Sequence, residues 1–232
     1  MLGRMKRNVL PLIALVLLCA LAACKSVPPA NNSSVGLDSG AAAPKAANPR
    51  LASASGFDFY LLNLSWSPEY CHSHPEAAEC ARRDTFVLHG LWPQNKDGTY
   101  PENCGEKQGP DPSQFSDIYP EPGLLQHEWK THGVCTGLSA TDFFTAARAA
   151  YQSVKVPPQL ANLSSQTSLP PDQIAALFTQ ANPGLRAENI AISCGHNYLT
   201  AVEVCLDKNL YPMACPAVRS CRANTVRIAP PQ

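Results

Sequence analysis

Apolar and polar residues follow two different periods along residues 57–228, and each period predicts one kind of element. Short apolar runs predict β-strands at 57–66, 84–92, 188–194, 198–206 and 224–228. Helical spacing of apolar residues predicts helices at 123–135, 141–154 and 171–181. The pattern predicts a single α+β domain at 57–232, in which helices pack on an antiparallel or mixed central β-sheet.

The first 24 residues have the features of an export signal. Three basic residues precede an apolar run at 9–21, which is shorter than the roughly 20 apolar residues of a membrane-spanning helix. The run ends in Leu21-Ala22-Ala23-Cys24, which resembles a bacterial lipobox and makes Cys24 a candidate for lipidation. The alternative is an ordinary signal peptide that is cut near Ala23. We expect an exported protein in the periplasm or on the cell surface, touching the membrane only through a lipid on Cys24, or secreted without it.

The segment that follows has no capacity for a core of its own. Residues 25–56 are rich in Ala, Pro, Ser and Asn, so we expect a disordered linker. Removal of 1–24 leaves 15 Lys and Arg against 18 Asp and Glu. This balance differs from that of proteins that hold nucleic acids by bulk electrostatics. Any contact with a nucleic acid must therefore come from a local site.

The cysteines indicate disulfides. Ten are present, and eight remain when Cys19 and Cys24 are set aside. An even number in an exported protein favours disulfide bonds, although the sequence alone allows about a hundred pairings. Zinc binding is the alternative, but no two cysteines have the Cys-x-x-Cys spacing of zinc sites.

A histidine stands near the end of the strand expected at 84–92, in the segment Phe86-Val-Leu-His-Gly-Leu-Trp-Pro-Gln94. A lone histidine at such a place is more often structural than catalytic. Here Gly90 follows His89 and allows a backbone or ligand to approach closely. We expect His89 and Trp92 to project onto one face of the strand, which would set an imidazole beside an aromatic surface on which a base can stack.

The second segment, His127-Glu-Trp-Lys-Thr-His-Gly-Val-Cys135, combines two histidines with a glutamate. On a helix, His127, Glu128, Thr131 and His132 would share one face. Such a face is costly to bury without a function, and the alternative is a solvated polar face. A zinc protease of the His-Glu-x-x-His type does not fit, because the two histidines are five residues apart. We expect no metal.

Together the two segments resemble the two active-site segments of the ribonuclease T2 family, which are secreted endoribonucleases that need no metal. Phe57–Cys71, Ile192–Gly195 and Glu203–Lys208 resemble the core strands of that family, so the resemblance covers residues 57–228. It implies a monomer without cofactors that cleaves single-stranded RNA and leaves DNA intact, because the nucleophile is the ribose 2′-OH. The implied products are a 2′,3′-cyclic phosphate and then 3′-phosphate ends.

The resemblance also implies roles for individual residues. His132 would be the base, His89 the acid and Glu128 a support for the charge of the transition state. Further implied positions are His127, Thr131 and Lys130 for phosphate binding, Trp92, Gln94 and Tyr100 for base binding, and the disulfides Cys71–Cys80, Cys104–Cys135, Cys194–Cys221 and Cys205–Cys215.

The chain departs from the family at one of these positions. The family usually has lysine where Thr131 stands, and here the lysine is Lys130, which either reaches back to the phosphate or is simply solvated. A catalytically weak relative that acts as an RNA-binding or toxin-like surface lipoprotein is the alternative function.

Overall fold

The structure is a computed structural model that describes residues 55–231. The expected signal peptide, the lipidation site Cys24 and the expected linker up to residue 54 lie outside the described residues. The strands are β1 (Phe59–Trp66), β2 (Phe86–Gln94), β3 (Thr167–Leu169), β4 (Ile190–Gly195), β5 (Tyr198–Leu206) and β6 (Val226–Ile228). The helices are α1 (Ser67–Ser73), α2 (Ala78–Ala81), α3 (Pro122–Thr131), α4 (Ala140–Ser153), α5 (Pro158–Ala161) and α6 (Pro171–Ala181), with 3-10 turns η2 (Pro112–Phe115), η3 (Gly133–Thr136) and η4 (Ala187–Asn189).

The strands form one mixed sheet. Its antiparallel part has the order β2-β1-β5-β4, and β6 joins β5 in parallel and β3 in antiparallel orientation. The expected α+β fold with a mixed sheet and helices is confirmed. β1 lies between β2 and β5, so both of its edges are paired.

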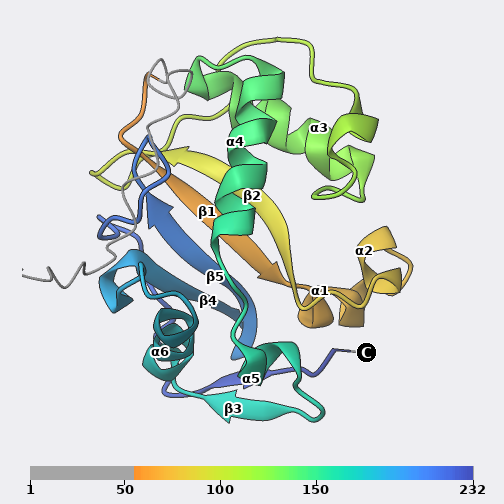
Figure 1. Ribbon diagram of the computed structural model, residues 1–232, viewed down its shortest axis with the longest axis vertical. Helices are drawn as coiled ribbons and strands as arrows, with labels where there is room; N and C mark the ends of the chain where they lie inside the picture. Colours follow the sequence, from red (N-terminus) through yellow and green to blue (C-terminus); the bar gives the residue numbers. More distant parts are fainter. Residues whose placement is uncertain (1–54, 232) are drawn as a thin grey trace, which may run out of the picture. The chain divides into compact units, whose positions relative to one another are not determined.

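One face of the sheet is covered by α4, which crosses β1 and β2 in Figure 1. Alternate residues of β1 point toward this helix, and Tyr60, Leu62 and Leu64 are buried there. The N-terminus of α4 is capped by Ser139, whose hydroxyl accepts a hydrogen bond from the Asp142 backbone N–H at 3.1 Å.

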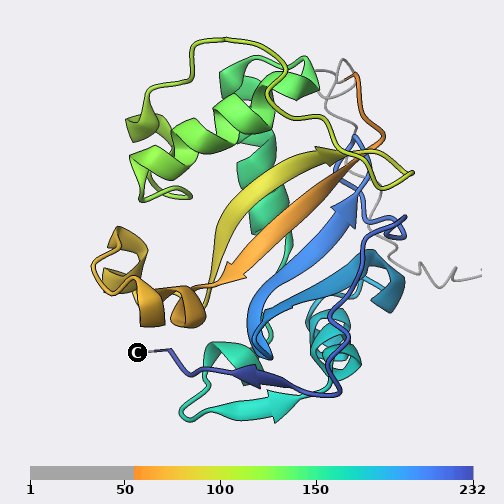
Figure 2. The same ribbon diagram turned by 180° about the vertical axis from the view of Figure 1, so that it is seen from behind.

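The other face carries the remaining β1 side chains and is seen in Figure 2. Phe59 and Leu61 form a small apolar cluster there with Cys205, against which Trp92 and Met213 pack. The segment that follows β5 crosses this face and is tied to the sheet by the Cys205–Cys215 and Cys194–Cys221 disulfides. The candidate catalytic residues lie on this face.

Four disulfides occur in the described part of the chain, and they are the pairs that the resemblance implies. The bridges are Cys71–Cys80, Cys104–Cys135, Cys194–Cys221 and Cys205–Cys215. Cys104–Cys135 closes a loop with a sequence separation of 31, which stabilises the fold by roughly 3–4 kcal/mol in the chain-entropy model.

The helix expected at 123–135 ends earlier, at Thr131, and this part of the prediction is wrong. His132 caps the helix, and the chain then tightens into η3. A Cβ atom at Gly133 would collide with the rings of Trp129 and Phe143, so the backbone turns in a space that only glycine fits. The disulfide at Cys135 holds the end of that turn.

Several short elements were not expected from the sequence. They are α1, α2, α5 and β3, each of three to seven residues. Within residues 55–231, none of the helices has the length and hydropathy that crossing a membrane requires.

Candidate active site

His89 occupies a β-bulge in β2. Gly90 pairs with Asn63 and Leu88 pairs with Leu64, so His89 is an extra residue without an opposite partner on β1. In a regular strand, His89 and Trp92 would point to opposite faces, because they are three residues apart. The bulge changes the phase, and the expected neighbourhood of the two side chains exists because of it.

Trp92 lies between two histidine rings. Its ring centroid is 5.4 Å from that of His89, in an edge-to-face arrangement, and 5.3 Å from that of His132. The indole Nε1 donates a hydrogen bond to Glu128 Oε2 at 2.8 Å. The Trp92 side chain therefore joins strand β2 to helix α3 and lies between the two histidines.

Gly90 makes this contact possible. A Cβ atom at residue 90 would overlap both Glu128 Oε2 and Trp92 Nε1. A backbone or a ligand was expected to approach Gly90 closely, and in the structure the approaching groups are these two side chains. Alanine at this position would displace the hydrogen bond between them.

Glu128 is fully buried at the base of the site. Its Oε1 atom has no hydrogen-bond partner in the described structure, and His89 Nε2 lies 3.8 Å from it. Burial raises the pKa of Glu128 from 4.5 to about 8, and the hydrogen bond from Trp92 opposes that rise. The carboxyl group is therefore mostly protonated at neutral pH when the site holds no ligand.

The pKa values of the two candidate acid–base histidines are both lowered. Burial lowers the pKa of His132 from 6.5 to about 4, with repulsion from His127 and His89 adding to the effect. Burial, followed by repulsion from His127, also lowers the pKa of His89. The Nδ1 atom of His132 is buried without a partner.

His127 is exposed at the rim of the site. Its ring centroid lies 6.3 Å from that of His132, and its Nδ1 atom is 3.5 Å from the Thr131 hydroxyl. Lys130 is exposed on α3. The expected helix face is therefore formed by His127, Glu128 and Thr131, and it is completed by His132 in the cap position.

The remaining expected base-binding residues lie farther along the chain. Gln94 is the last residue of β2, where it pairs with Phe59. Tyr100 is 54% exposed in the loop that follows. This loop is joined to the end of α3 by a hydrogen bond from the Asn103 backbone N–H to the Thr131 carbonyl at 2.8 Å.

Comparison with known proteins identifies the family. The family model for the ribonuclease T2 family matches residues 57–215. The chain belongs to the ribonuclease T2 family. A ribonuclease of Aeromonas hydrophila is 37% identical over 168 residues, which are 67% of this chain and 74% of that protein. A probable ribonuclease of Haemophilus influenzae is 31% identical over 178 residues, which are 68% of this chain and 61% of that protein.

Solved structures share the T2 fold. The SF11-RNase of Nicotiana alata, associated with gametophytic self-incompatibility, has a TM-score of 0.61 at 18% identity and covers 75% of this chain and 98% of that one. RNase NT in complex with 5′-AMP has a TM-score of 0.55 at 22% identity and covers 76% of this chain and 99% of that one. At these identities the likeness shows the fold alone.

One residue of this T2 site was not expected from the sequence. The Ser65 hydroxyl on β1 is 3.0 Å from His89 Nδ1. A serine in a strand carries no special signal, and only the pairing of β1 with β2 brings it to the histidine.

The T2 site also groups metal-binding atoms. His127, Glu128 and His132 each offer one donor atom, and these atoms lie within 4.8 Å of one another. Nitrogen and carboxylate donors suit Zn²⁺, so the cluster fits a transition-metal ion as well as a phosphate. The expectation that the reaction needs no metal stays a prediction.

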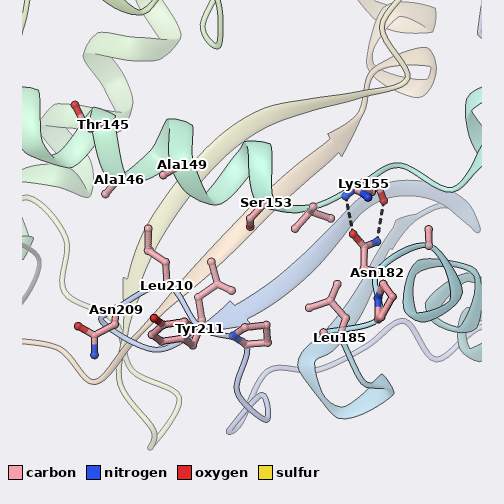
Figure 3. A pocket seen from close by; sticks show the side chains of 16 residues that line it. Thr145, Ala146, Ala149, Ser153, Lys155, Asn182, Leu185, Asn209, Leu210 and Tyr211 are labelled. Carbon is pink, nitrogen blue, oxygen red and sulfur yellow. Dashed lines mark hydrogen bonds between the residues drawn. The ribbon is translucent and has the colours of Figure 1, made fainter. Parts of the chain in front are cut away.

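A separate cavity of about 520 Å³ lies between α4, the end of α6 and the segment after β5. Figure 3 shows Asn182 in its wall, joined to the Lys155 backbone by two hydrogen bonds of 2.7 and 2.9 Å. The residues that line it include no histidine and no carboxylate, so it offers no acid–base pair for the T2 reaction.

Proposed function

We propose that the protein is an exported endoribonuclease that cleaves single-stranded RNA by transphosphorylation. The observation that carries the proposal is the arrangement of His89 and His132 on either side of Trp92, with Glu128 buried beneath them. Two imidazoles around one site provide a base and an acid for a phosphodiester whose ribose supplies the nucleophile. No cofactor is required.

In the first step, neutral His132 takes the proton of the 2′-OH as the 2′-oxygen attacks phosphorus. Charged His89 gives its proton to the leaving 5′-oxygen, and the bond between phosphorus and that oxygen breaks. The product is a 2′,3′-cyclic phosphate. In the second step the roles reverse, and water opens the ring to leave a 3′-phosphate.

His127 and Thr131 bind the phosphate from the rim, and Glu128 stabilises the charge pattern of the pentavalent state. Lys130 is exposed and contributes little. We assign base binding to Trp92, Gln94 and Tyr100 because an indole and a phenol give stacking surfaces and an amide gives hydrogen bonds. The substrate is RNA alone, and the protein acts as a monomer.

The pKa shifts give the proposed reaction an acidic optimum. The base must be neutral, which requires a pH above the His132 value of about 4. The acid must be charged, which requires a pH below the His89 value, itself lower than 6.5. The pH profile of kcat/KM for the unliganded enzyme should therefore peak between these limits.

The localisation proposed from residues 1–24 is the periplasm or the cell surface, with a lipid on Cys24 as the anchor. Residues 25–56 would then be the tether between lipid and enzyme. Replacement of Cys24 by alanine, followed by fractionation of cells, tests this. Release of the variant from the membrane fraction supports the anchor, and an unchanged distribution contradicts it.

The enzymatic proposal is tested by incubating the purified domain with RNA in EDTA. Cleavage of RNA to cyclic-phosphate ends, with DNA and fully 2′-O-methylated RNA left intact, is expected. His89→Ala and His132→Ala should each lower the rate by about 10²- to 10⁴-fold. His74→Ala is the matched control, because His74 is exposed after α1 and outside the site. RNA binding without turnover would support the alternative of a catalytically weak RNA-binding lipoprotein.

A further inference from the structure

Ser65 is a hydroxyl in the candidate site to which the proposed reaction gives no role. It lies on β1, where it pairs with Val87 of β2 on one side and Ala201 of β5 on the other. A central strand that is paired on both edges holds its side chains firmly. The partly buried hydroxyl reaches His89 Nδ1 at 3.0 Å across the bulge.

The two nitrogens of His89 therefore have different surroundings. Nδ1 meets the Ser65 hydroxyl, whereas Nε2 faces Glu128, whose Oε1 is 3.8 Å away. The edge-to-face contact with Trp92 is apolar and does not distinguish the nitrogens. In the described structure the hydrogen bond to Ser65 holds Nδ1 toward β1, and this leaves Nε2 on the side of Glu128.

The bulge makes the hydrogen bond between Ser65 and His89 important for the position of the His89 ring. His89 is the residue of the bulge that has no opposite partner on β1, so strand pairing does not hold its backbone as it holds the neighbouring residues. A half turn of the ring about the Cβ–Cγ bond would put Cδ2 in the place of Nδ1 and Cε1 in the place of Nε2, so neither nitrogen would keep its position. An imidazole that must give a proton in one step and take one in the next requires the same nitrogen at the substrate in both steps.

We infer that Ser65 is a positioning residue that fixes the tautomer and orientation of His89. In the charged ring, Nδ1–H donates to the Ser65 oxygen, and Nε2–H is the proton given to the leaving 5′-oxygen. After the transfer, Nδ1 keeps its hydrogen, and the Nε2 lone pair takes a proton from water in the second step. The inference rests on the proposed function for its catalytic meaning, whereas the tautomer itself is a property of the protein alone.

The inference predicts how kinetics depend on Ser65. Ser65→Ala should lower kcat by about 10-fold with little change in KM, because the hydroxyl acts through His89. The hydrogen bond stabilises the charged ring, so its loss lowers the His89 pKa, and the alkaline limb of the pH profile moves to lower pH. Ser65→Thr, which keeps the hydroxyl on a residue that favours strands, should restore most of both.

The deciding measurement is the ring ¹⁵N shifts of His89 in the unmodified protein. A neutral His89 with hydrogen on Nδ1 is expected, and hydrogen on Nε2 would overturn the inference without any variant. Ser168→Ala on β3 is the matched control for the kinetics. Normal kcat and an unmoved pH profile in a folded Ser65→Ala protein would also overturn it. If the unmodified protein does not cleave RNA but has the Nδ1–H tautomer, the proposed function fails and the positioning by Ser65 stands.

Discussion

Replacing Glu128 by glutamine should stabilise the fold at neutral pH while it lowers activity. Burial raises the carboxyl pKa from 4.5 to about 8, so the folded state keeps a proton that the unfolded chain releases. A raised pKa in the folded state stabilises the protonated protein. This contribution is complete below the pKa of the unfolded chain, and it is lost progressively as the pH rises from that value to the pKa of the folded state. At pH 7 the loss is about 3 kcal/mol, since each pH unit corresponds to about 1.4 kcal/mol. A glutamine cannot ionise and escapes this loss.

The glutamine carbonyl can still accept the hydrogen bond from Trp92, so the variant keeps this contact. Its amide is a weaker hydrogen-bond donor than a carboxyl group and cannot give a proton, so it should stabilise the transition state less well. Urea unfolding at pH values of about 4.5, 7 and 8.5 would measure the free energy of unfolding of both proteins. Their difference should grow with pH, while RNA turnover of the variant falls by roughly 10- to 100-fold. Glu102→Gln, an exposed position, is the control. Stability differences that stay constant across the pH range would refute the reasoning about Glu128.

Three further outcomes follow from the site. Thr131→Lys should raise kcat by about 10-fold, because a charged donor binds phosphate more strongly than a hydroxyl. Lys130→Ala should change kcat little. Loss of turnover in Lys130→Ala would show that this lysine does reach the phosphate. The double variant Cys104→Ala/Cys135→Ala should lose more activity than its stability explains, and an unchanged kcat in the folded variant would contradict this. Added Zn²⁺ should inhibit the enzyme reversibly, since the donor atoms of His127, Glu128 and His132 lie within 4.8 Å of one another and suit this ion. EDTA should leave turnover unchanged. Activation by Zn²⁺ would overturn the metal-free mechanism.

The long strands were predictable because their residues form apolar runs that are buried over most of their length. β1 and β5 begin and end within two residues of the expected runs, and α6 occupies the expected range. β3 was not predicted, because three residues carry no period and the strand depends on its pairing with β6. The end of α3 was misplaced because apolar spacing continues past His132, whereas the chain leaves the α-helix there and continues as the 3-10 turn η3.

The site was predictable in its chemistry but not in its geometry. The sequence names His89 and Glu128, yet nothing in the pattern of β2 indicates the bulge that turns His89 toward Trp92. The contact from Ser65 depends on strand register, which a local pattern does not contain. Likewise, the raised pKa of Glu128 results from burial by neighbours that are distant in sequence.

The loop at 95–111 contains no strand or helix. Its second half is bonded to α3 and to the turn η3 that follows this helix. The fastenings are the hydrogen bonds Asn103 N–H to Thr131 O, Trp129 Nε1–H to Lys107 O and Gln126 Nε2–H to Pro110 O, and the disulfide Cys104–Cys135. The first half is held by its own hydrogen bond from the Asn95 backbone N–H to Thr99 O at 2.9 Å, and by one from the Lys96 backbone N–H to Asp58 Oδ2 at 2.8 Å.

The loop therefore consists of two parts that are bonded to the rest of the protein to different degrees. Residues 103–110 are bonded to α3 and to Cys135, whereas residues 95–101 form an exposed tip that carries Tyr100 and is bonded outside the loop through Lys96 and Asp58. Substitutions in the tip should cost little folding stability, since most of its hydrogen bonds are internal. Under the proposed role of Tyr100 in base binding, exchange of this one short tip would change which bases the enzyme prefers and would leave His89 and His132 in place.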